Sequence, residues 1–320
     1  MINFNTYFYS QLYRYFKGIV FTIFFIFIIY KIYENFNFFE EKILLNIPLI
    51  LIIFFVHNIH HNFLNLRLFL LIKNCTNYIG SYFNWAQIFF DSLTFNILIS
   101  HTGSVYRAVE LKKRNVEYKQ FLGLYYISFL GYLIVNILLI NLEILFIDEV
   151  PQKFKLYVFI ILLFTLLISV SIPRLSKIFI RIFNFLKFEL FKKLANISLI
   201  IIDFIKTSVQ KSKTLLIVFV FSSISHFFEF LLFYLSYDLF MDQVNIEILI
   251  ILFSISFILD RIPILSNIPG LNETIFAIFS VPLGLYFNES FLIKLVLRFT
   301  GYFSVIFNFI IYKYLNYTNK

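Results

Sequence analysis

Long runs of apolar residues, separated by short polar stretches, dominate the pattern along the chain. A bilayer core about 30 Å thick is crossed by about 20 helical residues. Runs near that length predict membrane-spanning helices at 16–33, 43–59, 121–147, 156–172, 214–236, 248–265, 273–287 and 291–312. A ninth run, 86–100, is shorter and carries Asp91, Asn96 and several hydroxyl side chains. We therefore expect an all-α, polytopic integral membrane protein with about eight transmembrane helices.

Composition narrows the class of protein. The 320 residues are 60% hydrophobic and 14% charged, whereas a soluble domain is about 45–50% apolar and about 25% charged. This balance excludes a soluble globular domain and a disordered chain. Neither an internal repeat nor a linker divides the sequence, so we expect one helical membrane domain over 1–320. The first apolar run lacks a small-residue cleavage site, so we expect it to be retained as a helix.

Charge predicts the orientation. The formal net charge is +9, and bases gather at 102–120 and 174–213. Because Lys and Arg collect in cytoplasmic loops, we place these two stretches in the cytoplasm and expect no nucleic-acid partner. The acidic stretches 34–42 and 237–247 should face outward. If 86–100 crossed the membrane, the basic stretch 102–120 would lie outside. We therefore predict that 86–100 is a re-entrant segment or broken helix. We expect one or two re-entrant segments in the whole fold.

The 174–213 stretch has its own period. Its apolar residues recur every three or four positions, and its bases lie off that stripe. This pattern predicts a basic amphipathic helix on the cytoplasmic membrane surface. The alternative is an ordinary positively charged loop.

Motifs for catalysis or metal binding are weak. The segment His57-Asn58-Ile59-His60-His61 matches the HxxHH box of membrane di-iron enzymes, but such a centre needs several boxes and the chain has five histidines. An interfacial histidine cluster at the end of a span is the alternative that we favour. Cys75 is the single cysteine, which excludes an intrachain disulfide and a cysteine-based metal site. No GxSxG elbow, P-loop or GxGxxG loop is present. We expect no metal, no cofactor and no catalytic residue.

Charged residues inside the apolar runs are the stronger signal, because each costs about 2.5–3.5 kcal/mol at the bilayer centre. Glu229 lies inside the run 214–236, with His226 on the same helix face. Glu273 opens a short run and Arg298 lies in the last one. We predict that Arg298 faces the protein interior near Glu273 or Glu229. Asp260 and Lys294 belong to the same group, and for all of them the alternative is a snorkelling side chain at a helix end or a structural ion pair.

Helix breakers occur at two places. One is 100–104, followed by Arg107, and the other is 262–270, followed by Glu273. Interrupted hydrophobic segments mark midplane binding sites, and the helix that follows a break offers free N–H groups to a phosphate. We predict that Gly103 and Gly270 mark helix starts around one cavity. The alternative is a pair of ordinary loops at the membrane surface.

These motifs resemble those of a known family. The elements of the resemblance are Asn96-x6-Gly103-x3-Arg107-x3-Leu111 with a basic cluster after it, Pro263 to Pro269-Gly270-Leu271-Asn272-Glu273, Arg298 with Tyr302, and Arg67. In order and spacing the chain resembles the lysylphosphatidylglycerol synthase transmembrane-region family of flippase-like membrane proteins. It departs from the family pattern at Ser100-His101, where the family has Pro-Gly, and at Asn272, where it has Arg.

The resemblance implies a function. It suggests a protein of the cell inner membrane that binds or translocates an anionic phospholipid or lipid-linked glycan for cell-envelope biogenesis. We expect a non-enzymatic protein. The expected substrate-binding residues are Asn96, Gly103, Arg107, Glu229, Gly270, Glu273 and Arg298. The alternative is an integral-membrane glycosyltransferase or polymerase in envelope polysaccharide synthesis, for which Glu40 and Glu41 are the candidate acids.

Overall fold

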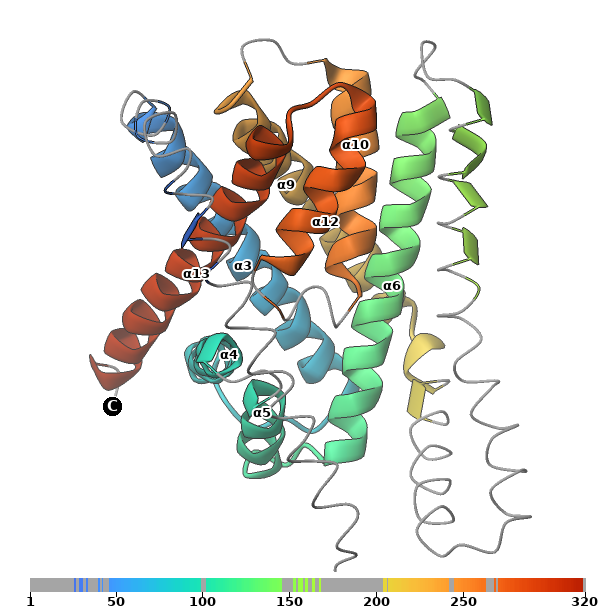
Figure 1. Cartoon of the computed structure of the whole chain (residues 1–320). Helices are drawn as coiled ribbons and strands as arrows, with labels where there is room; N and C mark the ends of the chain where they lie inside the picture. The colour runs from blue at the N-terminus through green and yellow to red at the C-terminus, as the bar shows by residue number, and fades with distance from the viewer. Residues whose placement is uncertain are drawn as a thin grey trace, which may run out of the picture. The chain divides into compact units, whose positions relative to one another are not determined.

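The structure is a computed structural model, and it describes residues 46–98, 102–145, 207–241, 245–262 and 270–318 together with scattered positions elsewhere. These ranges are helical and contain no strand. The helices are α3 (Ile47–Cys75), α4 (Tyr82–Leu98), α5 (Thr102–Lys112), α6 (Tyr118–Leu145), α9 (Ser212–Asp238), α10 (Ile246–Asp260), α12 (Leu271–Ser280) and α13 (Phe287–Thr318), with a short 3-10 turn, η1 (Val281–Leu283) (Figure 1).

Four of these helices, α3, α6, α9 and α13, are long and apolar enough to cross a membrane. They coincide with the runs predicted at 43–59, 121–147, 214–236 and 291–312, and they indicate a membrane protein. The runs predicted at 248–265 and 273–287 correspond to the shorter helices α10, with 15 residues, and α12, with 10 residues. The predicted spans 16–33 and 156–172 lie outside the continuous described ranges, as do residues 174–206 of the predicted amphipathic helix 174–213. The last residues of that stretch are described, and a turn at 210–211 separates residues 207–209 from the start of α9 at Ser212.

Helix α3 is longer than its apolar run predicts. We expected a span at 43–59, but the helix continues to Cys75. Two of its asparagines bond to side chains of α13: Asn308 Nδ2 donates to Asn58 Oδ1 (2.6 Å), Asn62 Nδ2 donates to Asn308 Oδ1 (2.9 Å), and Tyr312 Oη donates to Asn62 Oδ1 (2.6 Å). We call Asn58, Asn62, Asn308 and Tyr312 the asparagine ladder. Because this ladder removes the cost of polar groups between the helices, hydropathy alone ends the helix too early.

The histidine cluster consequently lies inside a helix. We expected 57–61 at the end of a span; the helix continues beyond them to Cys75, so these residues lie near the middle of α3, and their place at the membrane interface stays a prediction. His57 and His60 are buried, and His61 Nδ1 lies 3.0 Å from Ser304 Oγ. Among the described residues no group of three or more His, Cys, Asp or Glu side chains is arranged to hold a metal ion.

The chain forms two compact units. Unit 1 comprises residues 1–53 and 232–300, and unit 2 comprises residues 54–231 and 301–320. In unit 1 aromatic rings join the helices: Phe233 of α9 packs against Phe253 of α10 and against Phe276 of α12, with ring centroids 5.9 and 5.8 Å apart. In unit 2 the core brings together buried side chains of α3, α4, α5, α6 and α9, among them Leu71, Trp85, Phe90, Leu111, Leu124 and Val218.

Helices α4 and α5 of unit 2 pack against each other. The predicted break near Gly103 is present, because α4 ends at Leu98 and α5 begins at Thr102. A Cβ atom on Gly103 would lie 1.7 Å from the backbone oxygen of Ser92. The glycine is therefore required because the two backbones approach closely.

The basic stretch 102–120 is mostly helix rather than the loop that we expected. Lys112 and Lys113 at the end of α5 are exposed, while Arg107 in the middle of α5 is buried. The hydrogen bond from Lys113, reinforced by one from Arg114, holds the pKa of Glu110 below its usual value. The solvated positive charge of this stretch is thus concentrated at the C-terminal end of α5, where it interacts favourably with the negative end of the helix dipole.

Candidate functional site

The first candidate site surrounds the start of α12 in unit 1. Gly270 has a φ of +86°, which glycine adopts readily. Its backbone N–H donates to Glu273 Oε2 at 2.8 Å. Glu273 thus caps the helix with its own side chain, and its negative charge lies at the positive end of the helix dipole.

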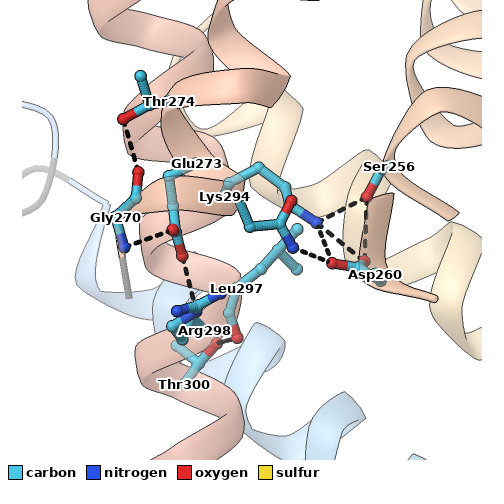
Figure 2. Close-up of polar contacts among 10 residues, drawn as sticks. Ser256, Asp260, Gly270, Glu273, Thr274, Lys294, Leu297, Arg298 and Thr300 are labelled. Atoms are coloured by element: carbon cyan, nitrogen blue, oxygen red, sulfur yellow. Dashed lines mark hydrogen bonds and ion pairs between the residues drawn. The ribbon is translucent and has the colours of Figure 1, made fainter. Parts of the chain in front are cut away.

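Glu273 also pairs with Arg298 of α13. The distance from Glu273 Oε1 to Arg298 Nε is 2.6 Å, and 1% of the Glu273 side chain and 12% of the Arg298 side chain are exposed (Figure 2). The expectation that Arg298 lies near Glu273 is confirmed. Arg298 Nη1 is buried without a hydrogen-bond partner among the described residues. The pair therefore neutralises the guanidinium but leaves one donor nitrogen available to an anion.

A second ion pair lies one helical turn away on α13. Lys294 Nζ lies 2.9 Å from both carboxylate oxygens of Asp260, at the end of α10, and 2.8 Å from Ser256 Oγ. Asn272 of α12 donates to Asp260 Oδ1 at 2.6 Å. Figure 2 shows Lys294 directed toward Asp260 and Ser256. Asp260 and Lys294 thus form one of the structural ion pairs considered as an alternative, and this pair connects α10, α12 and α13.

The second candidate site contains Arg107 in unit 2. Arg107 is 4% exposed. Its Nε donates to Ser92 Oγ of α4 at 2.9 Å, its Nη2 donates to the same oxygen, and its guanidinium lies 4.9 Å from the ring centre of Phe89. In the described part of the chain no carboxylate pairs with Arg107. Asn96 Oδ1 accepts the Gly103 N–H at 2.9 Å, so one donor at the start of α5 is already satisfied, contrary to our expectation of free N–H groups there.

Glu229 belongs to a third group of buried polar residues in unit 2, which lies on α3, α6 and α9. Tyr132 Oη donates to Glu229 Oε2, and His60 Nε2 lies 3.7 Å from Glu229 Oε1. Arg67 lies over the Tyr132 ring, 5.2 Å from its centre, and donates to Ser222 Oγ at 3.2 Å. Glu229 is therefore held by a phenol and an imidazole within this unit.

His226 has different partners from Glu229, although the two share a helix face. His226 Nδ1 lies 2.7 Å from Asn136 Oδ1, and His226 Nε2 lies 2.9 Å from Glu143 Oε1. Our reading of the sequence missed Tyr132, Asn136 and Glu143. Their spacings of four and seven residues place all three on one face of α6, so the pattern was available in the sequence.

The structure thus separates the predicted residues into three groups. Gly270, Glu273 and Arg298 are together in unit 1. Asn96, Gly103 and Arg107 are together on α4 and α5 of unit 2, and Glu229 lies with α3 and α6 of the same unit. That Gly103 and Gly270 line one cavity stays a prediction.

Comparison with known proteins does not assign the chain to a family. No family model matches the chain, and neither a curated protein nor a solved structure matches it.

Proposed function

We propose that the chain is a multi-pass protein of the cell inner membrane that binds and translocates an anionic phospholipid or lipid-linked glycan. In the proposed fold about eight helices cross the bilayer, and α4 with α5 forms a re-entrant hairpin. At 1.5 Å per residue the 17 residues of α4 and the 11 residues of α5 extend roughly 25 and 16 Å. Both lengths are shorter than a hydrocarbon core of about 30 Å, and in the proposed hairpin α5 returns the chain to the side from which α4 entered.

The observation that carries the proposal is the burial of Arg107, whose described partners are Ser92 and the Phe89 ring and include no carboxylate. A buried guanidinium is costly unless its charge is compensated and its donors are satisfied. Ser92 supplies an oxygen but no charge. A phosphate would supply both the charge and several acceptor oxygens, and arginine binds phosphate in a fork geometry.

Arg298 supports the same chemistry in unit 1. Its Nη1 is a buried donor without a partner in the described ranges, and it lies beside the start of α12, where the helix dipole favours an anion. Asn272 Oδ1 is a buried acceptor without a described partner. A head group with both a phosphate and a hydroxyl would match this combination of a donor and an acceptor.

The experiment uses the purified full-length chain reconstituted into proteoliposomes. Fluorescent phosphatidylglycerol and phosphatidylcholine are compared by reduction of the outer-leaflet label, with no sugar donor added. We expect movement of phosphatidylglycerol and its loss in Arg107→Ala and Arg298→Ala. Lys112→Ala removes an exposed charge from α5 and should behave as the wild type.

Lysine variants distinguish charge from geometry. Arg107→Lys and Arg298→Lys keep the charge but lose the fork, so they should restore little activity. Equal movement of both lipids by the wild type, or full activity in Arg107→Ala and Arg298→Ala, would contradict the proposal. A product that forms only with an added sugar donor would identify a transferase instead.

A further inference from the structure

The contacts of His226 in unit 2 determine which of its ring nitrogens carries hydrogen. Asn136 Nδ2 donates to the backbone oxygen of Tyr132 at 2.8 Å. This bond fixes the orientation of the Asn136 amide, because a flipped amide would place its oxygen against that carbonyl oxygen. Asn136 Oδ1 therefore faces His226 Nδ1, at 2.7 Å.

An amide oxygen accepts hydrogen bonds and cannot donate them. His226 Nδ1 must therefore carry the hydrogen of this bond. A neutral imidazole has one N–H, so a neutral His226 would present a bare lone pair at Nε2. That nitrogen lies 2.9 Å from Glu143 Oε1, and an ionised carboxylate is also an acceptor without a hydrogen.

Two acceptors at hydrogen-bond distance need a proton between them. We infer that His226 and Glu143 form a proton-binding site, in which the pair retains one exchangeable proton at the contact between Nε2 and Oε1. Either His226 is an imidazolium beside a Glu143 carboxylate, or a neutral His226 accepts from a Glu143 carboxylic acid. In both forms the pair has no net charge, which suits a location where 5% of the His226 side chain and 29% of the Glu143 side chain are exposed.

Other ionisable groups surround the pair in the same three-helix core. On α9 Glu229 lies one turn beyond His226, and it is contacted by Tyr132 of α6 and by His60 of α3. Arg67 of α3 lies over the Tyr132 ring. Ionisable groups within membrane-spanning helices mark proton and ion pathways, and these groups lie on the same helices as the pair or on α3 beside them.

Release of the proton changes the contact between α6 and α9. The proton passes from the nitrogen–oxygen contact to water, no other bond is broken, and the charge of the pair falls from zero to −1. The Nε2 lone pair and the carboxylate oxygen then repel one another. The site therefore makes this helix contact dependent on proton occupancy, independently of any lipid that the protein binds.

Nuclear magnetic resonance of the whole chain in lipid nanodiscs tests the inference. The protein is labelled with ¹⁵N-histidine, and its five histidines are assigned with His226→Asn. We expect Nδ1 of His226 to be protonated throughout the pH range in which the fold persists. We also expect either an imidazolium signal from His226 or an infrared carboxylic-acid band from Glu143.

Glu143→Gln is the matched variant. The glutamine amide can donate to His226 Nε2, so the helix contact is retained while the bound proton is no longer needed. The imidazolium signal or the carboxylic-acid band should disappear, and a pH-jump titration with an indicator dye should count one proton fewer per chain. Glu117→Gln, at an exposed position before α6, should leave the imidazolium signal or the carboxylic-acid band unchanged.

Two results would overturn the inference. One is a His226 that is protonated at Nε2 and bare at Nδ1. The other is a neutral His226 together with an ionised Glu143. Either result would show that the pair binds no proton beyond the single N–H of a neutral imidazole.

Discussion

Arg298 and Glu273 each lie where an unpaired charge is costly. Glu273 is fully buried and Arg298 nearly so, with 2.6 Å between Nε and Oε1. Removal of one partner from a buried pair leaves the other uncompensated, which typically costs about 3–5 kcal/mol. Replacement of both partners by uncharged groups costs much less.

A double-mutant cycle should therefore show strong coupling between these residues. We expect Glu273→Gln and Arg298→Leu each to lower the free energy of unfolding by a few kcal/mol, and the double variant to regain much of that loss. Thermal unfolding in detergent measures the cycle. Additive losses would show that the pair contributes no coupling and that each side chain acts separately.

Gly103 is required because the backbones of α4 and α5 approach closely at this residue. A Cβ atom there would meet the Ser92 backbone oxygen at 1.7 Å and Asn96 Oδ1 at 2.8 Å. Because a backbone oxygen cannot move aside cheaply, Gly103→Ala should separate α5 from α4 and cost at least about 1–3 kcal/mol.

The separation should also disturb the two bonds from Arg107 to Ser92, so we expect weaker binding of phosphatidylglycerol as well. The neighbouring exposed Ser104→Ala is the control for the stability measurement. Unchanged stability of Gly103→Ala would mean that the α4–α5 contact is looser than the distances indicate.

At the scale of elements, polar side chains decide where α3 ends. Its apolar run stops near residue 59, yet the helix continues because the asparagine ladder and Trp85, which donates to the Asn65 backbone oxygen at 3.1 Å, pack against its second half. An abundance of asparagine looks like compositional bias in a single sequence. Its pairing with a helix 250 residues away can be recognised only once both helices are placed.

Asn308 tests the importance of the asparagine ladder. It donates to Asn58 and accepts from Asn62, so Asn308→Leu leaves two polar side chains without these bonds. Interhelical polar contacts in membranes are worth about 0.6 kcal/mol on average and up to about 1.7 kcal/mol. We expect a loss in that range per bond in detergent unfolding.

Thr318→Ala, at the exposed end of α13, should leave the free energy of unfolding unchanged. Stability of Asn308→Leu equal to that of the wild type would show that the two hydrogen bonds of Asn308 contribute nothing to the contact between α3 and α13.

The candidate sites could be predicted from the sequence to different extents. The pairing of Arg298 with Glu273 follows from the cost of a lone charge in an apolar run, and the structure contains that pair. The partners of His226 do not follow from the pattern of any single apolar run. Asn136 and Glu143 lie on another helix, 90 and 83 residues away, and period alone does not show which helix faces which.

At the scale of the whole molecule, the topology remains a prediction from charge. If α4 and α5 are re-entrant, the basic end of α5 faces the cytoplasm while 34–42 faces outward. In a Cys75→Ser background, Lys113→Cys should be protected from a membrane-impermeant thiol reagent in whole cells, and Glu40→Cys should react with it. Both native side chains are exposed, so burial does not confuse the result.

Labelling of Lys113→Cys from outside would show that 86–100 crosses the membrane. In that case α4 would cross the membrane instead of forming a re-entrant hairpin with α5. Arg107 would then approach the outer leaflet rather than the inner one.

The Glu273 carboxylate is divided between two tasks, since one oxygen holds the Gly270 N–H and the other meets Arg298. An anion that competes for Arg298 returns the full carboxylate charge to the first turn of α12, where the helix dipole stabilises it. The Gly270 amide should then exchange with deuterium more slowly when phosphatidylglycerol is bound than in phosphatidylcholine alone. A backbone amide at a helix start would in this way report, from inside the protein, whether the neighbouring arginine is occupied.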